Sequence, residues 1–250
     1  MLFYREIQYF WQKECIALSL SPSQKLESLP ALLAYHSGKI ENGEVDYYTT
    51  RAIFENGKVE NYTGSIEALY RQQNHKCCYC FLKEKIENKE PLTKQLINDI
   101  HCIITAGDVG EDMFAIQKNK ENSRVPLGTS GITKTTQAEL DELLAELQRY
   151  RGDNWLALAT HFHAHFEKIY PATQSKGRVS RILLNYCLLT KGCPPTIIYE
   201  EDQKNYQECL RRSQIYHNLN PLVNFLAYET GKTWFEEWKK TQKGRQIYGE

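Results

Sequence analysis

A short segment between two amphipathic stretches carries the residues best suited to chemistry. It reads Ile169-Tyr-Pro-Ala-Thr-Gln-Ser-Lys-Gly-Arg-Val-Ser-Arg181 and leads into apolar residues with helical spacing. The backbone N–H groups and the positive dipole end at the start of a helix attract anions. Lys176, Arg178 and Arg181 add positive charge, and arginine suits bidentate contacts to phosphate. The segment therefore predicts a phosphate site, although a connecting loop with solvated basic residues would have the same spacing.

The elements that must position this segment are predicted to be helices. Apolar residues recur at intervals of three and four in the stretches 26–40, 66–70, 96–103, 140–147, 155–166, 179–186 and 222–226. Ser65 and Thr93 are predicted N-caps. The stretch 47–62 is ambiguous, because Asn56-Gly57 could end a short helix or turn a hairpin. The fold class is predicted to be all-α.

The helical pattern breaks between residues 107 and 131. This stretch contains five glycines or prolines among mixed polar residues. Long irregular segments inside a compact domain are commonly functional, so a loop or hairpin with a function is predicted here. Because the sequence contains no repeat or linker, residues 1–250 are predicted to form a single domain.

Composition narrows the classes of partner. The chain has 31 basic and 31 acidic residues, which gives no support to a general binder of nucleic acid or of a membrane surface. The short basic stretch 238–245 is typical of a solvated tail. The first residues lack a secretory pattern and no apolar run approaches the roughly 18 residues of a membrane span, so a cytoplasmic location is expected.

The eight cysteines are predicted to be reduced thiols. Cys77, Cys78 and Cys80 are clustered, but zinc would need a second pair of ligands at comparable spacing. The nearest candidates, His101 and Cys102, are adjacent in sequence. No metal site is therefore predicted from the cysteine pattern.

The basic segment and its flanks resemble the Fic family, whose signature is His-Pro-Phe-x-(Asp/Glu)-Gly-Asn-Gly-Arg-x-x-Arg. Similar stretches lie at 90–101, 160–169 and 184–198, and the resemblance covers roughly residues 26–230. It implies a Fic fold, which is a helical bundle with a small β-hairpin flap. The core would span 64–200 with the flap at about 107–131, followed by C-terminal helices at 201–250. It also implies protein adenylyltransfer from ATP with Mg²⁺, with a protein target or regulator docking at the flap by strand-like pairing.

A second motif resembles the inhibitory pattern of the same family, (Ser/Thr)-x-x-x-Glu-(Gly/Asn). Here it reads Ser37-Gly-Lys-Ile-Glu41-Asn42, and it implies an inhibitory helix at about 24–43. Ser37 and Glu41 are four residues apart, so they face one side of that helix. The resemblance implies that Glu41 pairs with Arg181 and blocks a productive pose of the ATP γ-phosphate.

The signature departs from the family where the chemistry occurs. Tyr170 occupies the place of the histidine that acts as general base, and a phenol of pKa ~10 is a poor base at neutral pH. Gln174 stands where an acidic residue would bind Mg²⁺, and Ala172 replaces the phenylalanine. Lys176 replaces the asparagine and could supply a fixed positive charge in place of the metal. His161, His163 and His165 precede the signature and are interpreted as packing or surface residues rather than substitute bases.

The residues that remain predict nucleotide binding without ordinary transfer. The phosphate set is Lys176, Gly177, Arg178 and Arg181, with Pro171 also retained at the entry. We therefore expect a degenerate Fic protein that binds ATP or another nucleotide without requiring Mg²⁺, with AMP transfer weak or lost. Two alternatives stay open: an active nucleotidyl or phosphate-ester transferase that modifies a protein hydroxyl by altered chemistry, and a protein-interaction module that keeps only the fold.

Overall fold

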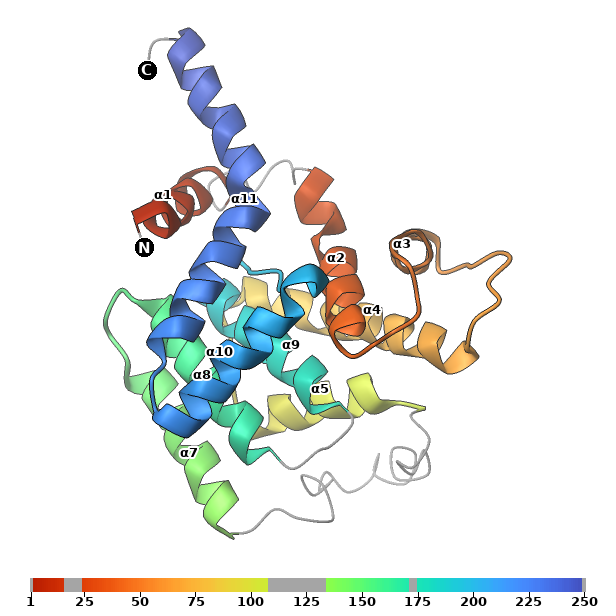
Figure 1. Ribbon diagram of the computed structural model, residues 1–250, viewed down its shortest axis with the longest axis horizontal. Coiled ribbons are helices and arrows are strands. Elements are labelled where there is room, and N and C mark those ends of the chain that lie inside the picture. The colour runs from red at the N-terminus through yellow and green to blue at the C-terminus, as the bar shows by residue number, and fades with distance from the viewer. Residues whose placement is uncertain (1, 16–23, 108–133, 171–174, 249–250) are drawn as a thin grey trace.

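The computed structural model describes residues 2–15, 24–107, 134–170 and 175–248. All regular secondary structure assigned within these ranges is helical, as the sequence predicts (Figure 1). Apart from Gly107, the predicted flap at 107–131 lies outside the described residues, and so do Pro171, Ala172 and Gln174. The described elements are α1 (Leu2–Phe10), a short π-helix (Trp11–Cys15), α2 (Gln24–Ile40), α3 (Tyr47–Asn56), α4 (Ile66–Glu87), α5 (Lys94–Thr105), α7 (Lys134–Arg149), α8 (Trp155–Ile169), α9 (Lys176–Thr190), a 3₁₀ turn (Glu200–Asp202), α10 (Gln203–Tyr216) and α11 (Asn220–Tyr248).

The helix ends follow from short-range hydrogen bonding. The Ser65 side chain accepts from the Ala68 N–H and the Thr93 side chain from the Leu96 N–H, so both predicted N-caps are confirmed. Gly57 follows α3 with φ of 66°, a left-handed conformation that glycine adopts without a Cβ penalty. The ambiguous stretch is therefore a helix that ends at Asn56, and the hairpin alternative is wrong.

The core is built around the antiparallel pair α8 and α9. Helices α4 and α5 pack against α9, while α7, α10 and α11 pack against α8 (Figure 1). Phe162 and Phe166 of α8 and Ile182 and Leu183 of α9 are almost fully buried. Burying a side chain of this size stabilises the fold by about 1.5–3 kcal/mol. This packing fixes α9, whose first turn carries the basic residues of the signature.

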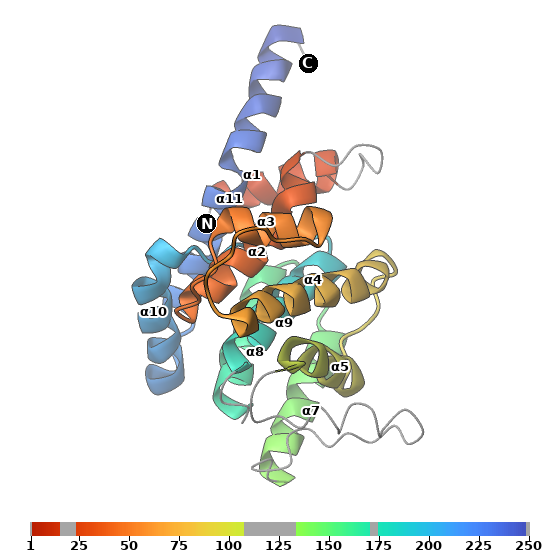
Figure 2. The ribbon, with the colours of Figure 1, turned by 90° about the vertical axis from the view of Figure 1, so that its right-hand side faces the viewer.

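A second apolar cluster holds α2 in place. It joins α1, the π-helix, α2 and α11, and Trp11 packs on Trp234 with ring centroids 4.9 Å apart. Leu29 and Leu33, on the predicted apolar face of α2, are buried in it. Helix α2 also lies against α3, α4 and α9 (Figure 2). The C-terminal end of α2 is thereby brought to the start of α9.

Helix α11 is the longest element in the described ranges and extends beyond the other helices at its C-terminal end, with α1 beside it (Figures 1 and 2). In the part of the chain that the structure describes, no helix has both the length and the apolar character to cross a membrane.

Candidate functional site

Two buried arginines define the site at the start of α9. The Arg178 and Arg181 side chains belong to residues that are only 3% and 7% exposed. Arg178 Nη1 donates to the Ile104 carbonyl at 3.3 Å. Arg181 donates from Nε to Ser37 Oγ at 2.9 Å and from Nη2 to the Ser37 carbonyl at 3.0 Å. Both guanidinium groups are thus held in fixed orientations by α5 and α2.

The Glu41 carboxylate spans both arginines. Its Oε1 lies 2.7 Å from Arg181 Nη2 and its Oε2 lies 3.1 Å from Arg178 Nε. The pairing of Glu41 with Arg181 that the resemblance implies is therefore present, and the contact to Arg178 is an addition. Burial acts to lower the pKa of Arg181, but the combined effects of Glu41, Tyr206 and Glu167 outweigh it, so the pKa is raised. One carboxylate thus lies between the two guanidinium groups and pairs with both of them.

The residues beside Glu41 set how it enters the site. Helix α2 ends at Ile40, and Asn42 adopts a left-handed conformation with φ of 60°. The Gly43 N–H donates to the Gly38 carbonyl at 2.9 Å and closes the turn. Asn42 therefore contributes through its backbone, by turning the chain directly after Glu41.

Gly177 allows this close approach. A Cβ at this position would lie 2.8 Å from Arg181 Nη1 and 2.8 Å from Glu41 Oε1. Ser175, two positions before Gly177, is buried, and its hydroxyl makes no hydrogen bond with the residues that the structure describes. The first N–H groups of a helix also lack partners within the helix. The start of α9 therefore combines a tight approach to the backbone with polar groups suited to an anion.

Lys176 adds a third positive charge. It is the first residue of α9, and its Nζ lies 4.0 Å from Glu167 Oε2, near the limit of an ion pair. Glu167 is buried, which raises the pKa of its carboxyl, while Arg181 and Lys176 act to lower that pKa. Lys176 and Arg181 therefore both act on Glu167, and the ammonium of Lys176 is only loosely paired with that carboxylate.

Tyr170 is packed into the protein. It is 5% exposed and its backbone N–H caps α8 by donating to the Phe166 carbonyl at 2.9 Å. Its ring stacks on Phe166 with centroids 4.5 Å apart and meets His101 edge-on at 5.7 Å. Packing on two rings restricts the phenol, whose ordinary pKa already makes it a poor base.

Buried polar side chains lie close enough to Arg178 and Arg181 to be affected by their charges. His163 is fully buried, and its Nδ1 and Nε2 lie 2.6 Å from Ser180 Oγ and 2.8 Å from the Tyr206 hydroxyl. His75 of α4 is also buried, and burial together with the charges of Arg178 and Arg181 lowers its pKa to about 3. His75, Glu167 and Ser180 were not singled out from the sequence. The sequence signal for His75 is weak: α4 has polar residues on a face that a helix of this length must bury.

His163 should make stability depend on pH. Burial, followed by the charge of Arg181, lowers the pKa of His163 to about 4, below its ordinary value of about 6.5. The unfolded chain therefore binds the proton first, and stability that is present above pH 6.5 is lost as the pH falls toward 4. Between pH 7 and pH 5 we expect His163 to reduce the free energy of unfolding by about 2 kcal/mol.

Urea denaturation at the two pH values, for the wild type and for His163→Gln, measures this effect. The variant should lose less stability than the wild type between pH 7 and pH 5. An equal loss in both proteins would show that His163 is not the group that titrates.

The cysteine cluster lies on α4, where Cys78 belongs to the hydrophobic core. Cys77 and Cys80 are exposed, whereas Cys78 is buried, and burial raises the pKa of the Cys78 thiol to about 12. The cluster therefore points in more than one direction around the helix. The absence of a metal at these thiols stays a prediction.

Comparison with curated proteins finds similarity to protein adenylyltransferases named Fic. The chain is 26% identical over 204 residues to the protein from Nematostella vectensis, which covers 80% of this chain and 46% of that protein. It is 35% identical over 202 residues to the protein from Drosophila willistoni, covering 80% of this chain and 40% of the relative. The chain thus spans less than half the length of these two relatives. No family model matches the sequence.

Comparison with solved structures shows the same fold. A Fic-domain-containing signalling protein from Bacteroides thetaiotaomicron aligns over 96% of this chain and 97% of its own, with a TM-score of 0.75 and 18% identity. A Fic-1 structure from Caenorhabditis elegans aligns over 95% of this chain and 70% of its own, with a TM-score of 0.72 and 19% identity. At these identities the likeness concerns the arrangement of helices alone.

Proposed function

The chain is a Fic-family protein, and from this premise we propose that it binds ATP or a related nucleotide at the start of α9, under inhibition by Glu41. The proposal further holds that AMP transfer from this site to a protein is weak or absent. The observation that carries the proposal is the Glu41 carboxylate across Arg178 and Arg181, because a fixed internal anion marks where an external one would be held.

The phosphate contacts follow from the charges and the backbone. Lys176, Gly177 and Arg178 lie on the first turn of α9, where N–H groups and the helix dipole favour a phosphate. Arg181 is one turn further along and would meet the terminal phosphate once Glu41 leaves. Ser37 holds Arg181 through two hydrogen bonds, so the guanidinium would not need to be ordered on binding.

Weak transfer follows from Tyr170. A general base typically accelerates a reaction of this kind 10²–10⁴-fold, and a buried phenol supplies little of this acceleration. His163, the buried histidine nearest in sequence, is engaged by Ser180 and Tyr206 and is fully buried. It therefore cannot reach a substrate hydroxyl without a rearrangement of the core.

The described groups do not fit the Mg²⁺ that the family implies. Glu41 is engaged by two guanidinium groups, and Glu167 is buried beside the Lys176 ammonium. At position 174 the sequence has a neutral amide, a weaker ligand for a hard cation than a carboxylate. We therefore propose that Lys176 neutralises part of the nucleotide charge in place of the metal.

Substitution of Lys176 tests this assignment. In the Glu41→Gly background and in EDTA, Lys176→Ala should weaken ATP binding by about tenfold, equivalent to one charge-assisted contact. Lys191→Ala is the matched control, because Lys191 lies at the opposite end of α9 and contacts Trp155. Competition of unlabelled ATP against a fluorescent analogue gives the affinities. Equal losses of ATP affinity in Lys176→Ala and Lys191→Ala would contradict a specific role for Lys176.

A transferase with altered chemistry is the second candidate. It is favoured by the intact Glu41–Arg181 pair, because an element that restrains a nucleotide has most use where the nucleotide reacts. Labelled ATP incubated with Glu41→Gly and a mixture of protein substrates would separate the candidates. Covalent labelling that disappears with Arg178→Ala would favour the transferase.

A further inference from the structure

The helix that carries Glu41 makes a second polar contact besides the one with the arginines. The C-terminal half of α2 lies against the 3₁₀ turn Glu200–Asp202. The Tyr35 hydroxyl donates to Glu200 Oε1 at 2.8 Å, and His36 Nδ1 lies 2.5 Å from Glu200 Oε2. One carboxylate of the turn thus bridges two consecutive side chains of α2. These residues do not belong to the proposed nucleotide site, so the contact needs a separate explanation.

The end of α2 is bonded to the residue that follows this turn. Gln203, the first residue of α10, donates from Nε2 to the Ile40 carbonyl at 2.6 Å. Ile40 is the last residue of α2 and directly precedes Glu41, and the last carbonyls of a helix lack partners within the helix. Gln203 therefore caps α2 one residue before the inhibitory carboxylate. The contact with the segment 200–203 thus extends along α2 from Tyr35 to Ile40.

Aromatic rings surround the contact at Glu200. His36 is 8% exposed, and its ring meets Tyr35 edge-on with centroids 4.9 Å apart and Tyr199 edge-on with centroids 4.6 Å apart. Burial, followed by the hydrogen bond to Glu200, raises the pKa of Tyr35 to about 12, so the phenol stays a hydrogen-bond donor. A hydrogen bond from a neutral donor to a carboxylate is stronger than one between two neutral groups.

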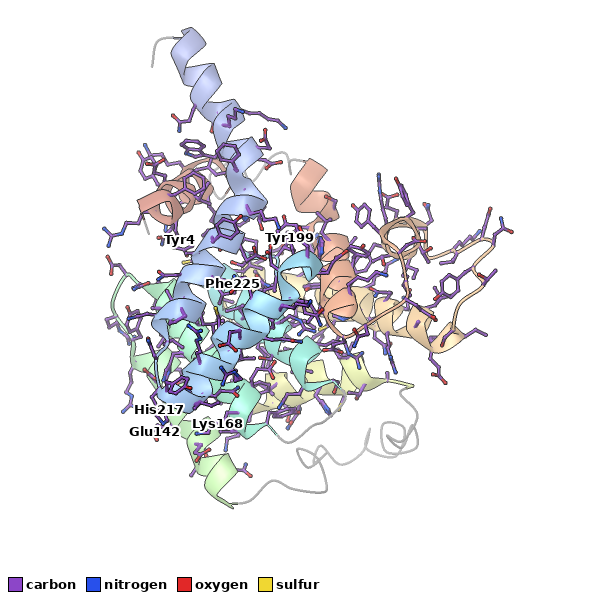
Figure 3. The ribbon with its side chains drawn as sticks, in the orientation of Figure 1. Tyr4, Glu142, Lys168, Tyr199, His217 and Phe225 are labelled. Carbon is purple, nitrogen blue, oxygen red and sulfur yellow. The ribbon has the colours of Figure 1, made fainter. Side chains whose placement is uncertain are left out.

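The turn itself is fixed to α11. Lys232 Nζ lies 2.7 Å from Glu201 Oε1 and 2.8 Å from Asp202 Oδ2. The Tyr199 N–H donates to Glu229 Oε2 at 2.8 Å, so Tyr199 lies between α2 and α11 (Figure 3). Helix α11 packs in turn against α8 and α10. The turn is therefore a fixed support for α2.

A metal site is the alternative interpretation of these residues. His36, Glu200 and Glu201 place possible ligand atoms within 4.8 Å of one another. The Lys232 ammonium already supplies a positive charge at Glu201, and Tyr35 already binds one oxygen of Glu200. We therefore interpret the cluster as a contact that holds α2 rather than as a cation site.

The backbone at Glu41 is tied to α2. The N–H groups of Glu41 and Gly43 both donate to the Gly38 carbonyl, at 3.0 and 2.9 Å. Glu41 Oε1 also lies close to Gly177, where a Cβ would come within 2.8 Å of it. A phosphate has four oxygens and takes more room than a carboxylate. Its binding at Gly177 therefore requires the end of α2 to shift, as well as the Glu41 side chain to turn.

We propose that the contact between α2 and the segment 200–203 is a latch, which holds α2 in its inhibitory position and thereby sets how strongly Glu41 opposes ATP. This latch rests on the proposed function, because it acts on the same nucleotide site. A partner that separates α2 from the segment 200–203 would strengthen nucleotide binding. The competing mechanism is rotation of the Glu41 side chain with α2 in place, which would make the inhibition independent of the latch.

Competition of unlabelled ATP against a fluorescent analogue, with the full chain, tests the latch. We expect Tyr35→Phe and Glu200→Gln each to tighten ATP binding by about three- to tenfold, because each weakens a contact that holds α2. Neither gain should exceed that of Glu41→Gly, since the latch acts through Glu41. In the Glu41→Gly background both substitutions should therefore leave ATP affinity unchanged.

Glu208→Gln is the matched control, because Glu208 pairs with Arg211 and Arg212 of its own helix α10. It should leave ATP affinity unchanged in both backgrounds. Tyr35→Phe removes a single hydroxyl, so its result stands even if Glu200→Gln disturbs the turn.

Hydrogen exchange measures the latch without nucleotide. The amides of residues 35–43 should exchange at least about threefold faster in Tyr35→Phe and Glu200→Gln than in the wild type, and at the wild-type rate in Glu208→Gln. Unchanged exchange in the two latch variants would overturn the inference.

The ATP affinities separate the latch from the proposed function. If Glu41→Gly tightens ATP binding but Tyr35→Phe and Glu200→Gln do not, the latch is overturned and the proposed function stands. Equal gains from the latch variants in the wild type and in Glu41→Gly would also overturn the latch, because they would not act through Glu41. Unchanged affinity in Glu41→Gly would overturn the proposed function instead, and the exchange rates would then decide whether the segment 200–203 holds α2.

Discussion

Replacing Glu41 by glycine will tighten ATP binding by about 10- to 100-fold. In the wild type the Glu41 carboxylate contacts Arg178 at 3.1 Å and Arg181 at 2.7 Å, so an incoming phosphate must displace it. Removal of the carboxylate takes this contact away from both buried guanidinium groups, so they can bind the phosphates of ATP instead. Calorimetric titration with ATP, with and without Mg²⁺, gives the ratio of the two dissociation constants.

The same substitution should weaken the fold in the absence of nucleotide. Removing one partner of a buried charge cluster costs about 3 kcal/mol, because the remaining charges lose their compensation. ATP should therefore raise the melting temperature of Glu41→Gly more than that of the wild type. Glu208→Gln is the matched control, since Glu208 also bridges two arginines, Arg211 and Arg212, but on the exposed surface of α10. If Glu41→Gly leaves ATP affinity unchanged, Glu41 does not inhibit binding.

Restoring a histidine at position 170 will not by itself restore transfer. In the Glu41→Gly background we expect Tyr170→His to give only a small part of the 10²–10⁴-fold gain available from a general base. The new imidazole would replace a ring packed between Phe166 and His101, where burial lowers a histidine pKa. The sequence also keeps a neutral amide at position 174, which does not bind Mg²⁺ as a carboxylate does.

The combination of Tyr170→His with Gln174→Glu should restore most of the missing activity, provided that Mg²⁺ is present. Transfer of labelled AMP to the protein itself or to added proteins, compared among the single and double variants, measures the two contributions and their coupling. Tyr170→Phe is the control for packing, because it removes only the hydroxyl. Strong transfer from Tyr170→His alone would show that position 174 matters less than we propose.

Local features of the fold could be predicted because they depend on short-range hydrogen bonds. Ser65 and Thr93 cap helices through residues three positions ahead, and Asn42 and Gly57 adopt conformations that their types favour. The choice at Asn56-Gly57 stayed open because the same dipeptide ends helices and turns hairpins. Packing of α3 against α2 and α4 favours the helix there, and that contact is not visible in a local pattern.

The site could be predicted only in part, for a related reason. The four-residue spacing of Ser37 and Glu41 places both on one side of a helix, and the resemblance supplied Arg181 as the partner. The second contact, from Glu41 to Arg178, depends on how α2 docks through Leu29 and Leu33. The burial of His75 beside the arginines likewise requires α4 to pack against α9. Such contacts join residues that are more than a hundred positions apart, so no local window of sequence contains them.

The central claim is that the start of α9 is a phosphate site which Glu41 closes, and a crystal structure of Glu41→Gly grown with ATP in metal-free buffer tests it most directly. We predict phosphate oxygens on the backbone N–H groups of Lys176, Gly177 and Arg178, with Arg181 on the terminal phosphate and still bonded to Ser37. A nucleotide bound elsewhere, or crystals in which no ATP contacts the guanidinium groups of Arg178 and Arg181, would contradict the claim and leave the Fic fold as a scaffold for protein contacts.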